Sequence, residues 1–371
     1  MKKLMMKSAI AMMRLVYSFF KLRKTENKIT FISRQQNTPT VDFLTLEKKI
    51  KEKFPDCETV ILTKRLEGKA SYIGHMLTQM KNMATSRTVI LDSYCIAVSV
   101  LKHKKDLRVI QMWHAMGSMK KFGYAMIDKE EGSPREVAET MKMHAGYDTI
   151  LISSMSFIKD YIEGFRCDPA AVKEIPLPKA DLLTDTAYRI RKVQKIYDRY
   201  PQLKKKSNII YCPTFRKNGD SKAGAAVKKL LDSIDFDRFN LIYKPHPLSR
   251  MTIDDPRVIT DFKDPFEMLF ISDYAITDYS SIMYEAGLLR MPVFLYAYDW
   301  DEYSSKRELN IDLQHDAPCM FTSDPKEIID AIEKDADGSA PLDLQMWNDF
   351  IKDNIHMPAG STCCDEIIKL L

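Results

Sequence analysis

From about residue 28 onward, the sequence alternates short apolar runs with longer amphipathic segments. A short apolar run is typical of a buried strand, and a longer segment with apolar residues at helical spacing is typical of a helix packed on a sheet. This alternation predicts βαβ units, in which helices connect neighbouring parallel strands. We therefore expect an α/β protein with parallel sheets.

Strand candidates fall into two consecutive series, separated by a charged helical segment and Pro201. They span residues 29–33, 59–63, 88–92, 108–113 and 149–153 in the first series, and 208–212, 240–243, 257–259, 274–277 and 292–296 in the second. A chain of 371 residues is long for a single core. Two series predict two Rossmann-like domains that face each other across a cleft. The expected domains are residues 25–190 and 191–371, preceded by a separate segment of residues 1–24.

The first 24 residues carry seven Lys or Arg side chains and no Asp or Glu, although the net charge of the whole chain is only +5. Apolar residues recur at helical spacing among these cations, and Arg14 interrupts the only run that could suggest a membrane span. We predict a basic amphipathic helix on the cytoplasmic face of the cell membrane. The expected membrane contacts are Lys2, Lys3, Lys7, Arg14, Phe19 and Phe20. The alternatives are a helix packed on its own protein and a disordered tail.

Several common functional classes lack their signatures in this chain. The seven cysteines have no metal-type CxxC spacing, which predicts a reducing compartment and no zinc site. The sequence contains no GxGxxG, GxxxxGK[ST], HExxH or GxSxG motif, which argues against dehydrogenase, P-loop, zinc-protease and hydrolase functions. Nucleic-acid binding is disfavoured because the excess positive charge lies on a short segment with an apolar face.

Residues 272–296 form the strongest local signal for a binding site. An apolar strand ends at Thr277 and Asp278 and leads through Ser280 and Ser281 into a helix that contains Glu285. Hydroxyl groups and free backbone N–H groups at such a helix start can bind a phosphate, and strand ends are where α/β domains keep their ligands. Glu285 could accept hydrogen bonds from ribose hydroxyls. The alternative for the serines is an ordinary helix N-cap.

Two more strand ends in the second series carry cationic or hydroxyl groups. Residues 240–249 deliver Lys244 and then His246, which stands between two prolines that exclude a helix. Residues 209–219 present Thr214 and Arg216, and arginine is a natural bidentate partner of phosphate. Salt bridging at the surface is the alternative for Arg216, and a structural role is the alternative for His246.

One strand end in the first series carries a histidine. Residues 108–124 lead from an apolar strand into Trp113 and His114, followed by Gly117. A histidine can accept a proton near neutral pH. The alternative is a structural histidine at the edge of the core beneath the tryptophan.

Four strand-end segments thus occur in the order WHAMG, CPTFR, KPHP and TDYSS. Their order and wording resemble the CDP-glycerol glycerophosphotransferase family of teichoic acid synthesis over roughly residues 28–330, and FISRQQNTPTVDF is similar to the start of the shorter, priming-type members. Ala115 stands where family members typically have glycine, which changes the expected shape of the acceptor pocket.

The resemblance implies a GT-B-like fold, with the acceptor site in the first domain and the donor site in the second. An acceptor hydroxyl would attack the β-phosphorus of a CDP-polyol, with CMP as the leaving group. The resemblance assigns His114 as the base and His246 to the diphosphate, together with Thr277, Ser280 and Ser281, with help from Arg216 and Lys244. Thr214, Asp278 and Glu285 complete the expected donor site.

The implied partners are a CDP-glycerol or CDP-ribitol donor, a lipid-linked saccharide or polyol-phosphate acceptor, and the membrane surface. No cofactor is implied, and no carboxylate cluster indicates a magnesium site. One alternative function is a GT-B glycosyltransferase that uses a nucleotide sugar, which shares the architecture. Another is a membrane-bound scaffold without catalytic activity.

Overall fold

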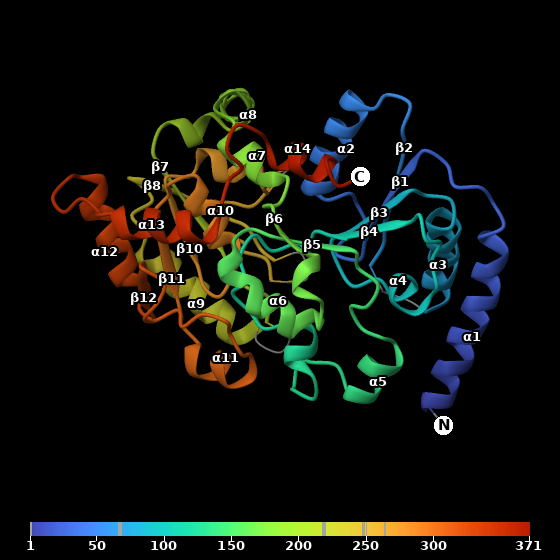
Figure 1. Cartoon of the computed structure of the whole chain (residues 1–371). Helices are drawn as coiled ribbons and strands as arrows, with labels where there is room; N and C mark the ends of the chain where they lie inside the picture. Colours follow the sequence, from blue (N-terminus) through green and yellow to red (C-terminus); the bar gives the residue numbers. More distant parts are fainter. Residues whose placement is uncertain (1, 66–68, 217–219, 247–248, 250, 263–264) are drawn as a thin grey trace. The chain divides into compact units, whose positions relative to one another are not determined.

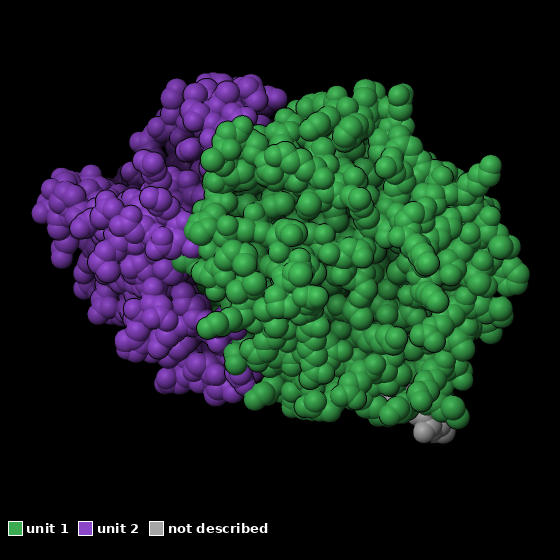
Figure 2. Space-filling view, viewed as in Figure 1, with its two compact units in different colours: residues 1–181, 354–371 green, residues 182–353 purple. Residues whose placement is uncertain are grey.

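The computed structural model describes residues 2–65, 69–216, 220–246, 249, 251–262 and 265–371. The chain forms two compact units (Figure 2): unit 1 comprises residues 1–181 and 354–371, and unit 2 comprises residues 182–353. Each unit contains one six-stranded parallel sheet (Figure 1). Two parallel-sheet domains are therefore present, as the two series of apolar runs predicted.

The sheet of unit 1 has the strand order β2-β1-β3-β4-β5-β6. Its strands are β1 Lys28–Ser33, β2 Glu58–Thr63, β3 Thr88–Leu91, β4 Arg108–Gln111, β5 Thr149–Ile152 and β6 Val172–Glu174. The chain moves outward from β1 to β2 and then returns to the other side of β1 at β3. The carboxyl ends of β1 and β3 therefore border a topological switch point, where open α/β sheets bind ligands.

Helices cover both faces of this sheet. They are α1 Lys2–Phe20, α2 Val41–Lys53, α3 Lys69–Met83, α4 Ile96–Val100, α5 Arg135–Thr140, α6 Ile158–Phe165, α7 Lys179–Thr184, which crosses into unit 2, and α14 Cys363–Ile368. One core cluster joins α1, α3 and α4 to residues of β1, β3 and β4. Ile32 of β1 belongs to this cluster. Because side chains alternate between the faces of a strand, the adjacent Phe31 points to the opposite face and packs on Phe43 of α2, with 5.1 Å between ring centroids.

Unit 2 repeats this plan with the order β12-β11-β10-β7-β8-β9. Its strands are β7 Ser207–Cys212, β8 Phe239–Tyr243, β9 Val258–Ile259, β10 Tyr274–Thr277, β11 Val293–Tyr296 and β12 Met320–Thr322. Its helices are α8 Thr186–Arg199, α9 Asp220–Ser233, α10 Ile282–Leu288, α11 Trp300–Lys306, α12 Pro325–Ala336 and α13 Gln345–Asn354. Here the switch point lies between β7 and β10.

The final residues of the chain pack with unit 1 rather than with the second series of strands. The carboxylate of Asp181 accepts hydrogen bonds from the backbone N–H groups of Cys363 (2.7 Å) and Cys364 (2.9 Å), and both cysteines are buried. The two units therefore differ from the expected domains of residues 25–190 and 191–371: unit 2 begins at residue 182, and residues 354–371 return to unit 1.

The N-terminal segment forms a helix, α1, that is apolar on two sides. Ile10 and Tyr17 are buried against α3 and α4, while another stripe faces solvent. The exposed stripe consists of Leu4, Met5, Met12, Leu15 and Phe19. Phe20, expected to contact a membrane, is partly buried against the core of unit 1, and the side chain of Lys2 lies outside the described residues. None of the described helices has the length and apolar character required of a membrane span.

Candidate functional site

His114 lies just beyond the carboxyl end of β4, at the sheet edge that contains the switch point of unit 1. The preceding residue, Trp113, has a φ of 63°, a conformation that costs a bulky L-residue about 1–3 kcal/mol. Trp113 nevertheless packs on Phe122 and Phe165, with 5.1 Å between ring centroids in each pair, and lies 4.3 Å from the His114 ring. This aromatic packing holds the turn that presents His114.

Hydrogen bonding fixes the orientation and tautomer of the His114 ring. Nδ1 lies 2.9 Å from the backbone oxygen of Asp92, just beyond β3. The side-chain amide nitrogen of Gln35, just beyond β1, lies 3.2 Å from the same atom but can only donate, so it does not bond to a protonated Nδ1. Because a carbonyl oxygen can only accept, the contact with Asp92 places the proton on Nδ1. Nε2 of the neutral ring then carries the lone pair and can accept a proton from a substrate hydroxyl.

The surroundings of His114 favour this neutral form. Desolvation by the surrounding protein lowers the pKa of His114 to about 4; the nearby Lys179 cation also lowers it, and the hydrogen bond to Asp92 acts in the opposite direction. The side chain nevertheless retains solvent-exposed surface. The ring is therefore neutral and able to accept a proton at neutral pH, although its environment disfavours the imidazolium that would form.

A buried carboxyl group, Asp92, lies in the same part of unit 1, and the sequence prediction did not include it. Its side chain is 2% exposed, and within the described residues neither carboxyl oxygen has a hydrogen-bond partner of normal length. Burial raises the pKa of Asp92 to about 7. The sequence signal was an aspartate directly after the apolar run of β3, the same pattern that singled out Asp278.

In unit 2, Arg216 joins the loops that follow β7, β10 and β11. Its guanidinium donates to both oxygens of Asp299 (2.7 and 2.9 Å), to Asp278 (2.9 Å) and to the backbone oxygen of Thr214 (2.9 Å). The carboxylate of Asp278 also accepts from the backbone N–H groups of Thr214 (2.9 Å) and Tyr279 (2.6 Å). These contacts clamp the loops at the switch point of unit 2.

The Arg216 clamp is enclosed by aromatic rings. The guanidinium carbon lies 4.8 to 5.5 Å from the ring centroids of Tyr279, Tyr298 and Tyr303, and the side chain is 11% exposed. Hydrogen bonding to Asp299 and the charge of Asp278 outweigh burial and raise the pKa of Arg216 further. The geometry therefore favours a buried ion pair for Arg216 over direct phosphate binding. Asp278, as a partner in this ion pair, has the same structural role.

The TDYSS segment contains both locked and accessible groups. Thr277 is fully buried and its hydroxyl donates to the backbone oxygen of Cys212 (2.7 Å), so it ties β10 to β7. Glu285 is also buried, on the first turns of α10. Ser280 and Ser281 are partly exposed, and Ser281 occupies the N-cap position without making a side-chain capping bond. The hydroxyl of Ser281 is therefore not used by the ordinary N-cap.

Lys244 and His246 follow β8 on the other side of β7. Both are partly exposed, and the His246 ring packs on Phe215, with 5.7 Å between centroids and an angle of 31°. Pro247, which was expected to fix the histidine from its far side, lies outside the described residues. The hydroxyl of Thr214 lines a cavity of about 20 Å³ beside His246 and is buried without a hydrogen-bond partner in the described part of the chain.

The predicted residues thus form two groups, one at the sheet edge of each unit. His114 stands in unit 1, while Lys244, His246, Ser280 and Ser281 are partly exposed on loops of unit 2, where the hydroxyl of Thr214 is buried. Arg216, Thr277 and Asp278 stabilise this part of unit 2 through hydrogen bonds. In the described part of the chain, no three His, Cys, Asp or Glu side chains are arranged to hold a metal ion. Sequence reasoning missed Asp92 and Asp299, each of which ends or follows an apolar strand.

Comparison with known proteins identifies relatives of this architecture. The chain is 26% identical over 322 residues to the teichoic acid ribitol-phosphate primase of Bacillus spizizenii, covering 83% of this chain and 82% of the primase. It is 28% identical over 368 residues to the teichoic acid poly(ribitol-phosphate) polymerase of the same organism, covering 95% of this chain but 58% of the polymerase. The structure of the wall teichoic acid polymerase TagF superposes with a TM-score of 0.77 at 17% identity, covering 100% of this chain and 96% of that chain.

The comparison with protein families confirms the resemblance seen in the four strand-end segments. Residues 14–348 match the family described as CDP-Glycerol:Poly(glycerophosphate) glycerophosphotransferase. The match extends beyond the four segments at both ends and spans both sheets. The chain therefore belongs to the CDP-glycerol glycerophosphotransferase family.

Proposed function

We propose that this member of the glycerophosphotransferase family transfers glycerol phosphate, or a related polyol phosphate, from a CDP-activated donor to a hydroxyl group of a lipid-linked acceptor in teichoic acid synthesis. The acceptor oxygen forms a bond to the β-phosphorus of the donor. The bond from that phosphorus to the bridging oxygen breaks, and CMP leaves with the electron pair. The relatives with primase and polymerase functions support this reaction class.

His114 acts as the general base in this proposal. Its Nε2 accepts the proton of the acceptor hydroxyl as the new oxygen–phosphorus bond forms. The hydrogen bond from Nδ1 to Asp92 holds the ring in the required tautomer and stabilises the imidazolium that results. A positioned base of this kind contributes roughly 10²- to 10⁴-fold to the rate.

The exposed groups of unit 2 hold the donor diphosphate. Lys244 and His246 supply cationic or hydrogen-bonding groups on one side of β7, and Ser280 and Ser281 supply hydroxyls on the other. Charge that accumulates on the phosphate oxygens and on the leaving CMP is stabilised by such donors. The ion pair and hydrogen bonds of Arg216 hold the loops after β7 and β10 together.

In this proposal unit 1 contributes the base and unit 2 contributes the donor-binding groups of a GT-B-like enzyme at the cytoplasmic face of the membrane. The TM-score of 0.77 to TagF supports a GT-B-like fold. The exposed apolar stripe and the cations of α1 support a peripheral position at the membrane surface. Confinement there raises the effective concentration of a lipid-linked acceptor.

The observation that carries the proposal is the neutral, oriented imidazole of His114 within the family match. The test incubates the chain with a synthetic lipid acceptor and CDP-glycerol, CDP-ribitol or UDP-sugars, and measures nucleotide release and product mass. We expect acceptor-dependent CMP release and a product heavier by one or more polyol phosphates. Release of UDP alone would support the nucleotide-sugar alternative and refute the proposal.

A further inference from the structure

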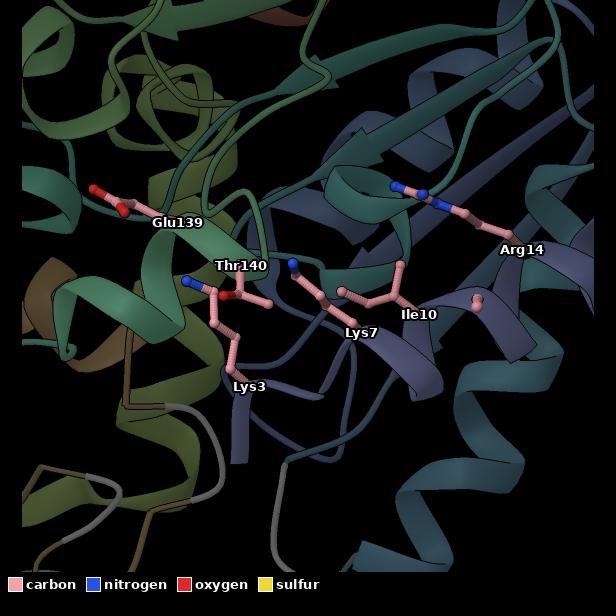
Figure 3. Close-up of a pocket in the computed structure, with 7 residues that line it drawn as sticks. Lys3, Lys7, Ile10, Arg14, Glu139 and Thr140 are labelled. Atoms are coloured by element: carbon pink, nitrogen blue, oxygen red, sulfur yellow. The ribbon is translucent and has the colours of Figure 1, made fainter. Parts of the chain in front are cut away.

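A groove in unit 1 lies between α1 and α5, on the surface rather than at either sheet edge. Its volume is about 500 Å³ (Figure 3). It is lined by Lys3, Lys7, Ile10, Ala11, Arg14, Glu139 and Thr140. The buried side chain of Ile10 and the small side chain of Ala11 leave room between the longer cationic side chains. A space of this size accommodates a small polar headgroup.

The groove carries an excess of positive charge that the described residues do not neutralise. Lys3, Lys7 and Arg14 form no ion pair within that part of the chain, and Arg14 is anchored through Nε to the backbone oxygen of Val100 at 3.0 Å. In Figure 3 the carboxylate of Glu139 points away from the ammonium groups of Lys3 and Lys7. Three cations against one carboxylate favour an anionic ligand.

The same helix places an apolar surface beside these cations. Lys3, Lys7 and Arg14 are separated by four and seven residues, so they share one face of α1. The exposed apolar stripe of Leu4, Met5, Met12, Leu15 and Phe19 runs along the neighbouring face, directed away from the buried Ile10 and Tyr17. A ligand with a phosphate group and an apolar tail matches both faces at once.

We propose that the groove between α1 and α5 is a binding site for the phosphate of an anionic phospholipid headgroup, with the apolar stripe of α1 inserted beside the acyl chains. Lys3 and Lys7 contact the phosphate oxygens, Arg14 adds positive charge farther along the groove, and Thr140 provides a hydroxyl donor. The proposal rests on the proposed function only for the location at a membrane. It adds a specific lipid site, in contrast to a diffuse attraction between a basic helix and an anionic surface.

The first test compares two variants that lose the same charge. Lys3→Gln with Lys7→Gln removes two groove cations, and Arg23→Gln with Lys24→Gln removes two exposed cations just beyond the end of α1. Binding of the full chain to phosphatidylcholine vesicles, with and without phosphatidylglycerol, is measured by co-sedimentation. We expect a roughly 30-fold loss for the groove variant on the anionic vesicles and a loss of less than about fivefold for the control. Equal losses, or equal binding of the unmodified chain to both vesicle types, would overturn the proposal.

The second test looks for a gain of affinity rather than a loss. Among the described residues that line the groove, Glu139 is the only carboxylate, and Glu139→Gln removes it, whereas Glu136→Gln removes an exposed carboxylate of α5 outside the groove. We expect the Glu139 variant to bind phosphatidylglycerol vesicles roughly two- to fivefold more tightly, and the Glu136 variant to be unchanged. An equal gain in both variants would indicate diffuse electrostatics and contradict a defined site.

These measurements are independent of transferase activity, because they contain neither donor nor acceptor. If the donor screen fails while the groove variants behave as expected, the lipid site stands and the proposed reaction falls. If CMP release is observed but the charge-matched variants do not differ, the reaction stands and the lipid site falls.

Discussion

The role of Arg216 separates two interpretations of the switch point in unit 2, and replacing it with methionine distinguishes them. Methionine has no charge and cannot hydrogen-bond to Asp278 or Asp299, which are 0% and 10% exposed at the side chain. Removing one partner of a buried ion pair leaves an uncompensated charge and costs about 3–5 kcal/mol. Arg216→Met should therefore destabilise unit 2 by about that amount.

The expected loss is large enough to measure by thermal unfolding. For a domain the size of unit 2, residues 182–353, each 1 kcal/mol shifts Tm by roughly 2–4 °C, so Tm should fall by roughly 6–20 °C. The matched control is Arg257→Met, which breaks a 2.6 Å ion pair with Asp255 in the same unit. Because the Arg257 side chain is 54% exposed, this control should lower Tm far less than Arg216→Met does.

A phosphate-binding arginine would give the opposite pattern. If Arg216→Met kept the Tm of the unmodified chain but weakened CDP-glycerol binding tenfold or more, the structural role would be refuted and Arg216 would belong to the donor site. Restoring part of the lost stability with Asp299→Asn in the Arg216→Met background would support the ion-pair account, because one unpaired carboxylate is then neutralised.

Three further predictions concern unit 1. Because the pKa of His114 is lowered to about 4, kcat/KM should be nearly flat from pH 5.5 to 8 in a pH–rate profile, and an inflection near 6.5 that belongs to His114 would contradict its assigned environment. Burial raises the pKa of Asp92 to about 7, so between about pH 4 and 7 the folded state binds a proton that the unfolded state has lost, and the free energy of unfolding falls as pH rises. Asp92→Asn should abolish this pH dependence and stabilise unit 1 by about 2–4 kcal/mol at pH 8, measured by urea unfolding. An unchanged pH dependence in the variant would contradict this assignment. Asp181→Ala removes the acceptor of two backbone N–H groups of α14 and should cost unit 1 about 2–4 kcal/mol, whereas a change under 0.5 kcal/mol would contradict the docking of α14.

Much of the fold follows from apolar periodicity in the sequence. All ten predicted strands are confirmed to within two residues at each end, because each is a mostly apolar run bounded by polar or turn-forming residues. The two strands that were missed, β6 Val172–Glu174 and β12 Met320–Thr322, are three residues long and lie at sheet edges with partly exposed side chains. Such short edge strands leave little periodic signal. The return of α14 to unit 1 depends on the distant Asp181, which no local pattern reveals.

The sequence indicated which strand ends carry the candidate residues, but not the contacts that those residues make. Strand ends identified His114, Ser280 and Ser281 because ligand sites occur there in parallel sheets. The same rule could not distinguish a structural role of Arg216 from phosphate binding, because the structural role depends on Asp299, 83 residues away. Similarly, the neutral state of His114 follows from the protein that surrounds it, and from Asp92, rather than from its neighbours in sequence.

The most direct test of the central claim is the affinity of His114→Asn for CDP-glycerol, measured by calorimetry alongside its acceptor-dependent CMP release. Because His114 is assigned to deprotonate the acceptor and the exposed groups of unit 2 are assigned to hold the donor, the account predicts a dissociation constant within about twofold of the unmodified chain and a turnover roughly 10²- to 10⁴-fold lower. A variant that keeps its turnover, or that loses donor affinity in proportion to turnover, would contradict this division of roles.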